Sequence, residues 1–225
     1  SIFTQSYSNY EILVINDGGD SIDNILEYFN YNTKLKLFNL EKNYGRAYAR
    51  NFGIKQAKGT YLCYLDDDDI FYPTTMLGDL IELSHRYEGR VICRFAKKVE
   101  WIDGGQLSPY ITWKQINDSR LREDIFFGSG GGVLIPPNAV HEDILNEKSF
   151  LENSPTADDI WLNAMCRLVS REMISTATPF SLLPVANRDK TDLSSINNGQ
   201  LMNDRQLKQV IAYCKKAHGV DPFEF

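Results

Sequence analysis

An apolar run that ends in four consecutive aspartates constrains the fold of this chain most. Residues 61–65 (YLCYL) have a composition typical of a strand that is buried on both faces. Asp66, Asp67, Asp68 and Asp69 follow directly. Adjacent carboxylates at the end of a strand repel one another, and a divalent cation with oxygen ligands offsets this repulsion. An acidic run alone is more often a solvated loop, but this context favours a Mg²⁺ or Mn²⁺ site beside a bound phosphate.

The first half of the chain alternates predicted strands with predicted helices. Strands are indicated at 11–15, 34–40 and 61–65, and helices near 22–29, 45–58 and 76–84. This order predicts an α/β fold with a mostly parallel sheet and helices on both of its faces. Ligands of such sheets bind beyond the carboxyl ends of the strands. Because Asp17 follows the first strand and Asp66 to Asp69 follow the third, we expect these carboxylates to converge.

The pattern changes after residue 89. Strands are predicted at 90–95, 96–102 and 133–135, and helices at about 158–169 and 203–217. A glycine-rich segment, residues 128–132, precedes the last of these strands. The sequence has no internal repeat, low-complexity segment or linker. Residues 1–225 are therefore predicted to form a single domain.

Composition argues against several classes of protein. The chain has 225 residues, of which 43% are hydrophobic, so it can bury a core. Its net charge of −6 argues against nucleic acid as a partner. No apolar run is long enough to span a bilayer, and the start does not resemble a signal peptide. The four cysteines are far apart within predicted strands and helices, which indicates reduced core residues of a cytosolic protein: Cys63, Cys93, Cys166 and Cys214.

Five short motifs follow one another over roughly the first ninety residues. They are residues 9–19 (NYEILVINDGG), 43–45 (NYG), 49–53 (ARNFG), 57–59 (AKG) and 65–69 (LDDDD) with Pro73. Together they resemble family-two glycosyltransferases of the GT-A fold. Residues 129–137 (SGGGVLIPP) and 157–162 (ADDIWL) are similar to a bacterial subgroup associated with surface-polysaccharide assembly.

The resemblance implies a fold, an activity and a set of partners. The fold is a Rossmann-like GT-A domain with a nucleotide-binding half, residues 1–89, and an acceptor half with the C-terminal helix, residues 90–225. The activity is metal-dependent, inverting transfer of the hexosyltransferase type, with Mn²⁺ or Mg²⁺ as cofactor. The donor is a nucleotide sugar, UDP-linked by the family's preference, and the acceptor is a saccharide or a lipid-linked molecule in cell-surface polysaccharide synthesis.

The start of the chain is unusual for such a family. It begins Ser1-Ile2-Phe3, without Met and within a predicted helix. Family members begin with a strand and a small polar motif that line the nucleotide pocket, followed by the helix of which residues 1–7 would be the end. We therefore expect that the first strand is missing from this sequence.

The resemblance assigns donor-side roles to five residues. Asp17 accepts hydrogen bonds from the nucleobase, or else closes the turn before Gly18. Asp68 and Asp66 match the Asp-x-Asp signature, with Asp68 as the main metal ligand and Asp66 or Asp67 at the ribose or a metal-bound water. The register along the four aspartates stays open, because neighbouring strand residues point opposite ways. Arg50 lies near the diphosphate, or else pairs with an acid on a helix surface.

The acceptor side needs a base that takes the proton of the attacking hydroxyl. By resemblance that base is Asp159, with Asp158 as the second choice. Both also fit a structural role, since Asp is a common helix N-cap. Trp161 is expected in the core more than against an acceptor sugar. The polar stretch 187–192 is a candidate lid over the nucleotide.

Other functions fit parts of the pattern. An inactive nucleotide-sugar-binding relative would keep the same motifs without the chemistry. A Mg²⁺-dependent phosphohydrolase would need an aspartate nucleophile on the first strand and a downstream lysine, and we find no such set. His85, His141 and His218 are isolated in the sequence, so each is expected to be structural or exposed. We expect a cytoplasmic protein, with peripheral contact at the inner face of the cell membrane where the acceptor is lipid-linked.

Overall fold

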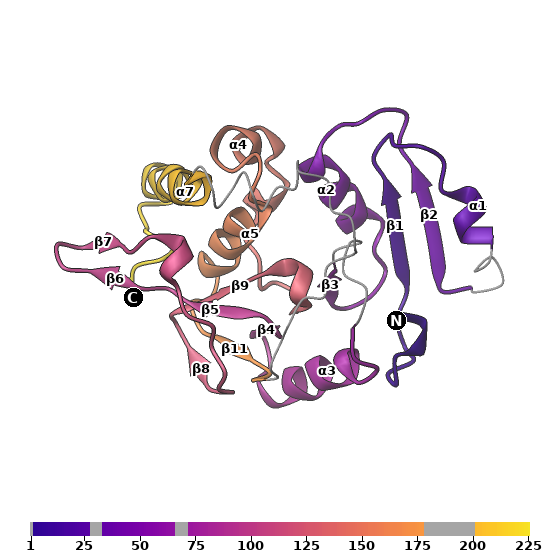
Figure 1. Cartoon of the computed structure of the whole chain (residues 1–225), viewed down its shortest axis with the longest axis horizontal. Helices are drawn as coiled ribbons and strands as arrows, with labels where there is room; N and C mark the ends of the chain where they lie inside the picture. The colour runs from indigo at the N-terminus through magenta and orange to yellow at the C-terminus, as the bar shows by residue number, and fades with distance from the viewer. Residues whose placement is uncertain (1, 28–32, 66–71, 178–200) are drawn as a thin grey trace.

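The computed structural model describes residues 2–27, 33–65, 72–177 and 201–225 (Figure 1). The acidic run 66–69 and the candidate lid at 187–192 lie outside these residues. A small β1–β2 layer with α1 and α2 stands at one side of the molecule, and a larger sheet with α3, α5 and α7 forms the rest (Figure 1). The first turn of the described chain is a short 3₁₀ helix, η1 (Ile2–Thr4).

The N-terminal layer is a two-stranded parallel sheet. β1 (Ile12–Asn16) pairs with β2 (Leu35–Asn39), with Ile12 opposite Leu35. A short helix, α1 (Asp23–Leu26), follows β1, and α2 (Arg46–Gln56) lies against that strand. The strands are half-buried rather than enclosed, because one layer of helix covers them.

The main sheet has five strands and is mixed. Its order is β3 (Leu62–Tyr64), β10 (Val133–Ile135), β4 (Val91–Cys93), β11 (Met173–Ser175) and β8 (Leu121–Arg122). β3, β4 and β11 run in one direction, while β10 and β8 run against them. The parallel arrangement expected of this fold therefore holds for β1 with β2 and for these three strands. β3 stands at the edge of the sheet among the described pairings, so it is half-buried rather than covered on both faces.

Helices cover both faces of the main sheet, as predicted. α3 (Met76–Arg86) packs on one face and α5 (Asp158–Arg167) on the other. Side chains alternate between the faces as the pleat requires. Those toward α3 are Ile92, Leu134 and Ile174, and those toward α5 are Val91, Cys93, Val133 and Met173.

The remaining elements all lie after residue 95 of the chain. β5 (Ala96–Lys98) pairs with β9 (Ile125–Phe127), and β6 (Trp101–Ile102) forms a hairpin with β7 (Gln106–Leu107). The predicted strand at 96–102 is thus two strands, since the chain changes partner after Lys98. The others are η3 (Tyr110–Thr112), η4 (Ser129–Gly131), η5 (Glu142–Leu145), α4 (Glu147–Asn153) and α7 (Met202–His218).

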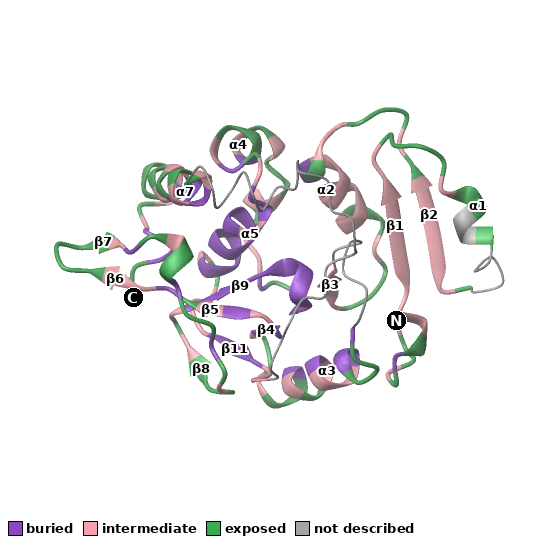
Figure 2. Ribbon diagram, in the orientation of Figure 1, coloured by how far each residue is buried: buried purple, intermediate pink, exposed green. Residues whose placement is uncertain are grey.

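Burial is concentrated in the second half of the chain. Figure 2 shows α5, β9 and η4 largely buried, whereas β1 and β2 are intermediate. All four cysteines are free thiols, and three of them are buried, in agreement with the sequence analysis. Within the described residues, no helix combines the length and the apolar character needed to cross a bilayer.

Candidate active site

Asp17 ties the end of β1 to the start of α2. Its Oδ1 accepts a hydrogen bond from the backbone N–H of Tyr44 at 2.9 Å, and its Oδ2 accepts one from Gly45 at 2.8 Å. Gly45 is the N-cap residue of α2. Asp17 therefore does more than close its own turn, because its carboxylate accepts a hydrogen bond from the backbone of a residue 27 positions away.

Gly18 lets two backbone segments approach closely beside Asp17. Its φ is +70°, in the left-handed region that favours glycine. A Cβ at this position would lie 2.1 Å from the carbonyl carbon of Lys42 and 2.2 Å from the nitrogen of Asn43. The motifs at 9–19 and 43–45, separate in the sequence, therefore meet backbone against backbone.

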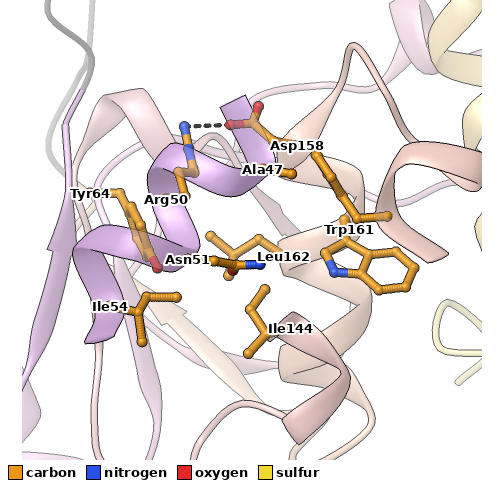
Figure 3. A pocket seen from close by; sticks show the side chains of 10 residues that line it. Ala47, Arg50, Asn51, Ile54, Tyr64, Ile144, Asp158, Trp161 and Leu162 are labelled. Atoms are coloured by element: carbon orange, nitrogen blue, oxygen red, sulfur yellow. Dashed lines mark ion pairs between the residues drawn. The ribbon is translucent and has the colours of Figure 1, made fainter. Parts of the chain in front are cut away.

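Arg50 joins α2 to α5. Its Nη2 lies 2.6 Å from Oδ2 of Asp158, and both of its Nη atoms lie 3.1 Å from the Ser129 hydroxyl oxygen (Figure 3). Arg46, one turn earlier, reaches Oδ1 of Asp158 at 3.3 Å. The ring of Tyr64, the last residue of β3, lies under the Arg50 guanidinium, 5.0 Å from centroid to Cζ. The pairing of Arg50 with an acid is thus observed, in a largely buried site rather than on a helix surface.

A pocket opens beside this ion pair. Arg50 and Asp158 form one rim, and Ile54 and Ile144 lie at the opposite side (Figure 3). The remaining lining residues are Ala47, Asn51, Tyr64, Phe150, Trp161 and Leu162. The pocket is mostly apolar with a charged rim, a common character of sites for small organic ligands.

Asp159 is held by the glycine-rich turn. The backbone N–H of Ser129 donates to its Oδ1 at 2.9 Å. Burial raises the pKa of Asp159 to about 6, and the neighbouring Asp158 carboxylate adds to this rise. Arg50 and the Ser129 hydrogen bond oppose it. Asp158 forms ion pairs with two arginines, whereas Asp159 is the carboxylate whose affinity for a proton is raised.

The helix N-cap role proposed for these acids is wrong. The N-cap residue of α5 is Ala157, and no side chain caps the helix there. Asp158 and Asp159 are instead the first two residues of the helix, where its dipole favours a negative charge.

Asn163 fixes the first turn of α5 and was not identified from the sequence. Its Nδ2 donates to the carbonyl of Phe127 and to that of Asp159, both at 2.8 Å, and its Oδ1 accepts the N–H of Phe127 at 3.0 Å. The side chain is fully buried. One signal was present, since an amide stands four residues after Asp159, about one helical turn away, between the apolar Leu162 and Ala164.

The glycine-rich turn is a packed element rather than a flexible linker. Ser129, Gly130 and Gly131 form a buried 3₁₀ turn, and the Tyr72 hydroxyl donates to the Gly130 carbonyl at 2.7 Å. Tyr72 is the first described residue after the acidic run. Trp161 belongs to the core, as predicted, with 2% of its surface exposed.

Adjacent residues of α2 link the two sides of the site. Gly45 contacts Asp17, and Arg46 contacts Asp158. The structure therefore brings Asp17, Arg50, Asp158 and Asp159 around the first turns of α2 and α5. The expected ligands Asp66, Asp67 and Asp68 lie outside the described residues, so their convergence with Asp17 stays a prediction.

Comparison with known proteins identifies the family. Residues 1–142 match the model of glycosyl transferase family 2. The chain belongs to this family. An uncharacterized glycosyltransferase of Haemophilus influenzae is 41% identical over 153 residues, which cover 64% of this chain and 60% of that protein.

Other relatives of this family-2 chain match over shorter stretches. Escherichia coli WfgD, named a UDP-Glc:alpha-D-GlcNAc-diphosphoundecaprenol beta-1,3-glucosyltransferase, is 40% identical over 75 residues, 32% of this chain and 28% of WfgD. The matches cover only 10% to 12% of the length of three Rickettsia glycosyltransferases. The chain thus spans less than two thirds of these curated relatives.

A solved structure shares the fold. S. aureus TarS, residues 1–349, superimposes with a TM-score of 0.54 at 17% identity, over 78% of this chain and 52% of that one. The likeness confirms the α/β fold of the GT-A type for the family-2 chain.

Proposed function

We propose that this chain is a metal-dependent, inverting glycosyltransferase. It transfers a sugar from a nucleotide-sugar donor, UDP-linked, to a saccharide or lipid-linked acceptor in cell-surface polysaccharide synthesis. Family membership supports sugar transfer. The name of the relative WfgD, with its UDP-linked donor and diphosphoundecaprenol acceptor, supports these substrate classes. A lipid-linked acceptor would bring the chain to the cytoplasmic face of a membrane.

The arrangement of Asp159 carries this proposal. An inverting transfer needs a carboxylate that removes the acceptor proton while the hydroxyl attacks the anomeric carbon. A base is most effective when its pKa lies near the working pH, and burial brings the pKa of Asp159 to about 6. The Ser129 N–H orients Oδ1, which leaves Oδ2 as the other oxygen of the carboxylate. That oxygen is the one we assign to the acceptor hydroxyl.

Asp158 and Arg50 position this base. The ion pair holds the first turn of α5 against α2, and the Asp158 charge raises the proton affinity of Asp159. Arg50 is in addition the cation that we place near the donor diphosphate. Asp17, tied to the start of α2, is proposed to accept from the nucleobase through its remaining lone pairs.

The metal assignment rests on the acidic pattern. Asp68 and Asp66 would hold Mn²⁺ or Mg²⁺, which when bound neutralises the departing diphosphate. The chain enters this segment from Leu65, next to Tyr64 under Arg50, and leaves it at Tyr72, bonded to Gly130. Both flanks therefore lie beside the turn that holds Asp159, which supports a ligand site there.

Asp159→Asn tests the proposal directly. It keeps the size of the side chain and an oxygen that can accept from Ser129, but removes the base. We expect transfer from a UDP-sugar in Mn²⁺ to fall by about 10²- to 10⁴-fold. Donor binding, followed by calorimetry, should stay within a factor of about three of the native value. Asp20→Asn, on an exposed residue, is the matched control.

Two results would contradict the proposal. Sugar transfer at the native rate by Asp159→Asn would show that Asp159 is not the base. Tight binding of nucleotide sugars with neither transfer nor donor hydrolysis in the native protein would instead support an inactive, binding-only relative.

A further inference from the structure

Two of the three histidines of this chain meet an aspartate outside the candidate active site. His141, Asp143 and His218 each direct a potential ligand atom so that these atoms lie within 4.8 Å of one another. The His141 and His218 rings pack edge to face with centroids 4.6 Å apart. The sequence analysis took these histidines as isolated in the sequence and expected each to be structural or exposed; His141 and His218, which are 77 positions apart in the sequence, nevertheless meet in the structure.

The hydrogen bonds of the cluster prepare the carboxylate as a ligand. Oδ2 of Asp143 accepts from the Tyr213 hydroxyl at 2.6 Å and lies 2.8 Å from Nε2 of His218. A hydrogen-bonded anion facing two imidazoles is a common environment of metal ligands.

We propose that His141, Asp143 and His218 bind a divalent ion of the zinc type, with water as the fourth ligand. Two nitrogens and one carboxylate oxygen are the donors that Zn²⁺ accepts in a tetrahedral site with one open position. Such a set discriminates against Mg²⁺, which prefers oxygen ligands in an octahedron. Among the described residues, this is the one group of three or more His, Cys, Asp or Glu side chains with such convergence.

Small movements would complete the site. Ligand atoms of a tetrahedral zinc ion lie about 3.3 Å apart, given bonds near 2.0–2.1 Å. The ion would replace the proton between His218 Nε2 and Asp143 Oδ2 and separate these atoms by about 0.5 Å. His141 now accepts the Asp143 N–H through Nδ1 at 3.1 Å, so coordination exchanges this hydrogen bond for a bond to the metal.

The site would fix the C-terminal helix to the pocket wall. His218 is the last residue of α7, and His141 and Asp143 lie at η5. The backbone N–H of His141 also donates to the Met165 carbonyl of α5 at 3.0 Å. The next residue after Asp143 is Ile144, which lines the pocket beside Arg50. A bound ion would therefore hold η5, α5 and α7 in one arrangement, a structural role separate from the Asp66–Asp68 site.

Zinc retention by the whole chain tests this inference without any donor or acceptor. The protein is stripped with a chelator, incubated with one equivalent of ZnCl₂, passed through a desalting column and assayed for metal. We expect one zinc ion per chain in the native protein, and loss of it in His218→Ala and Asp143→Asn. His85→Ala, which changes an exposed histidine, should retain the metal. Zinc at 100 times its dissociation constant should raise the Tm by roughly 5–10 °C.

Cobalt provides an independent readout of geometry. Co²⁺ added to the stripped protein should give the strong visible absorption of a tetrahedral site, and His218→Gln, which keeps a polar side chain, should abolish it. Equal zinc in the native and His218→Ala proteins would overturn the inference, as would no retained zinc or an octahedral cobalt spectrum. Zinc retained by His218→Ala but lost in Asp68→Asn would assign the ion to the acidic run instead. Since no transfer is measured, failure here leaves the proposed glycosyltransferase activity standing, and the reverse also holds.

Discussion

The two halves of the molecule hold their parts of the site by different means. In β1 and β2 nearly every residue is half-buried, whereas β4, β9, β10 and β11 are buried throughout (Figure 2). The first half positions Asp17 through backbone hydrogen bonds to Tyr44 and Gly45. The second half positions Asp159 on α5, in which all residues except Asp159 itself are buried.

This difference matches the proposed tasks. A group that binds a nucleobase works while solvated, and half-buried strands with backbone anchors can adjust around a ligand. A base needs a proton affinity shifted by burial, and only a closely packed region holds a carboxylate away from water. The ion pair of Arg50 with Asp158 joins the half-buried first half of the molecule, the adjustable half, to the closely packed second half, the fixed half.

Matched phenylalanines measure the contrast in packing. Phe127 of β9 is completely buried, whereas Phe38 of β2 is half-buried and touches Phe52 edge to face at 5.3 Å. Phe127→Ala should lower the free energy of unfolding by about 3–5 kcal/mol, the usual cost of a large core cavity. Phe38→Ala should cost roughly 1–2 kcal/mol, since less apolar area is lost. Urea denaturation measures both, and equal losses would remove the contrast.

Gly18→Ala probes how the adjustable half is held. The new Cβ would collide with the backbone at Lys42 and Asn43, so the turn at Asp17 has to open. We expect a loss of about 3 kcal/mol, from the left-handed φ and the collision together. Gly104→Ala is the control, because Gly104 has φ +93° with no atom within 4 Å of the added Cβ. It should lose only about 1 kcal/mol. Similar losses at both positions would show that the close approach at Gly18 is unimportant.

Local patterns in the sequence predicted the helices and the long motifs well. The helical periods before Gly59 and around Leu207 gave α2 and α7 to within two residues, and the strand at 133–135 was correctly bounded. Local patterns carry no information on partners far along the chain. The antiparallel insertion of β10 between β3 and β4, and the very short β8, depend on such pairing.

The site shows the same division. Residue type and motif made Asp159 and Arg50 candidates, but the sequence did not predict the residues that surround them. Arg46 and Asp158 are 112 residues apart, and the buried Asn163 joins α5 to β9 through backbone groups that a side-chain pattern cannot reveal. The meeting of His141 with His218 was missed for the same reason.

Asp159→Asn should stabilise the protein while inactivating it. The folded pKa near 6 lies above the ordinary 3.8, so the folded state binds this proton more tightly than the unfolded state. The stability that the protonated Asp159 contributes is therefore lost as pH rises from about 4 to about 6, and this loss persists above that range. Above pH 6 the variant should be more stable by roughly 1–3 kcal/mol, with the difference vanishing near pH 4. The Tm of the native protein and of the variant, measured from pH 4 to above pH 6, tests this prediction. A gain in Tm that does not vary with pH would contradict the raised pKa of Asp159.

Arg50→Gln should move the acid limb of the kcat profile, and this is the smallest effect. Arg50 lowers the pKa of Asp159, so its removal lets that pKa rise and the limb shifts to higher pH, by about half a unit to one unit. Arg46→Gln is the matched control, because Arg46 is more exposed than Arg50 and pairs with the same Asp158 at the longer distance of 3.3 Å. The acid limb of the Arg46→Gln kcat profile should lie at the same pH as that of the native protein. If both variants shift the limb equally, Arg50 has no particular part in setting the proton affinity of Asp159. If Arg50→Gln shifts the limb to lower pH, a group other than Asp159 titrates in the reaction.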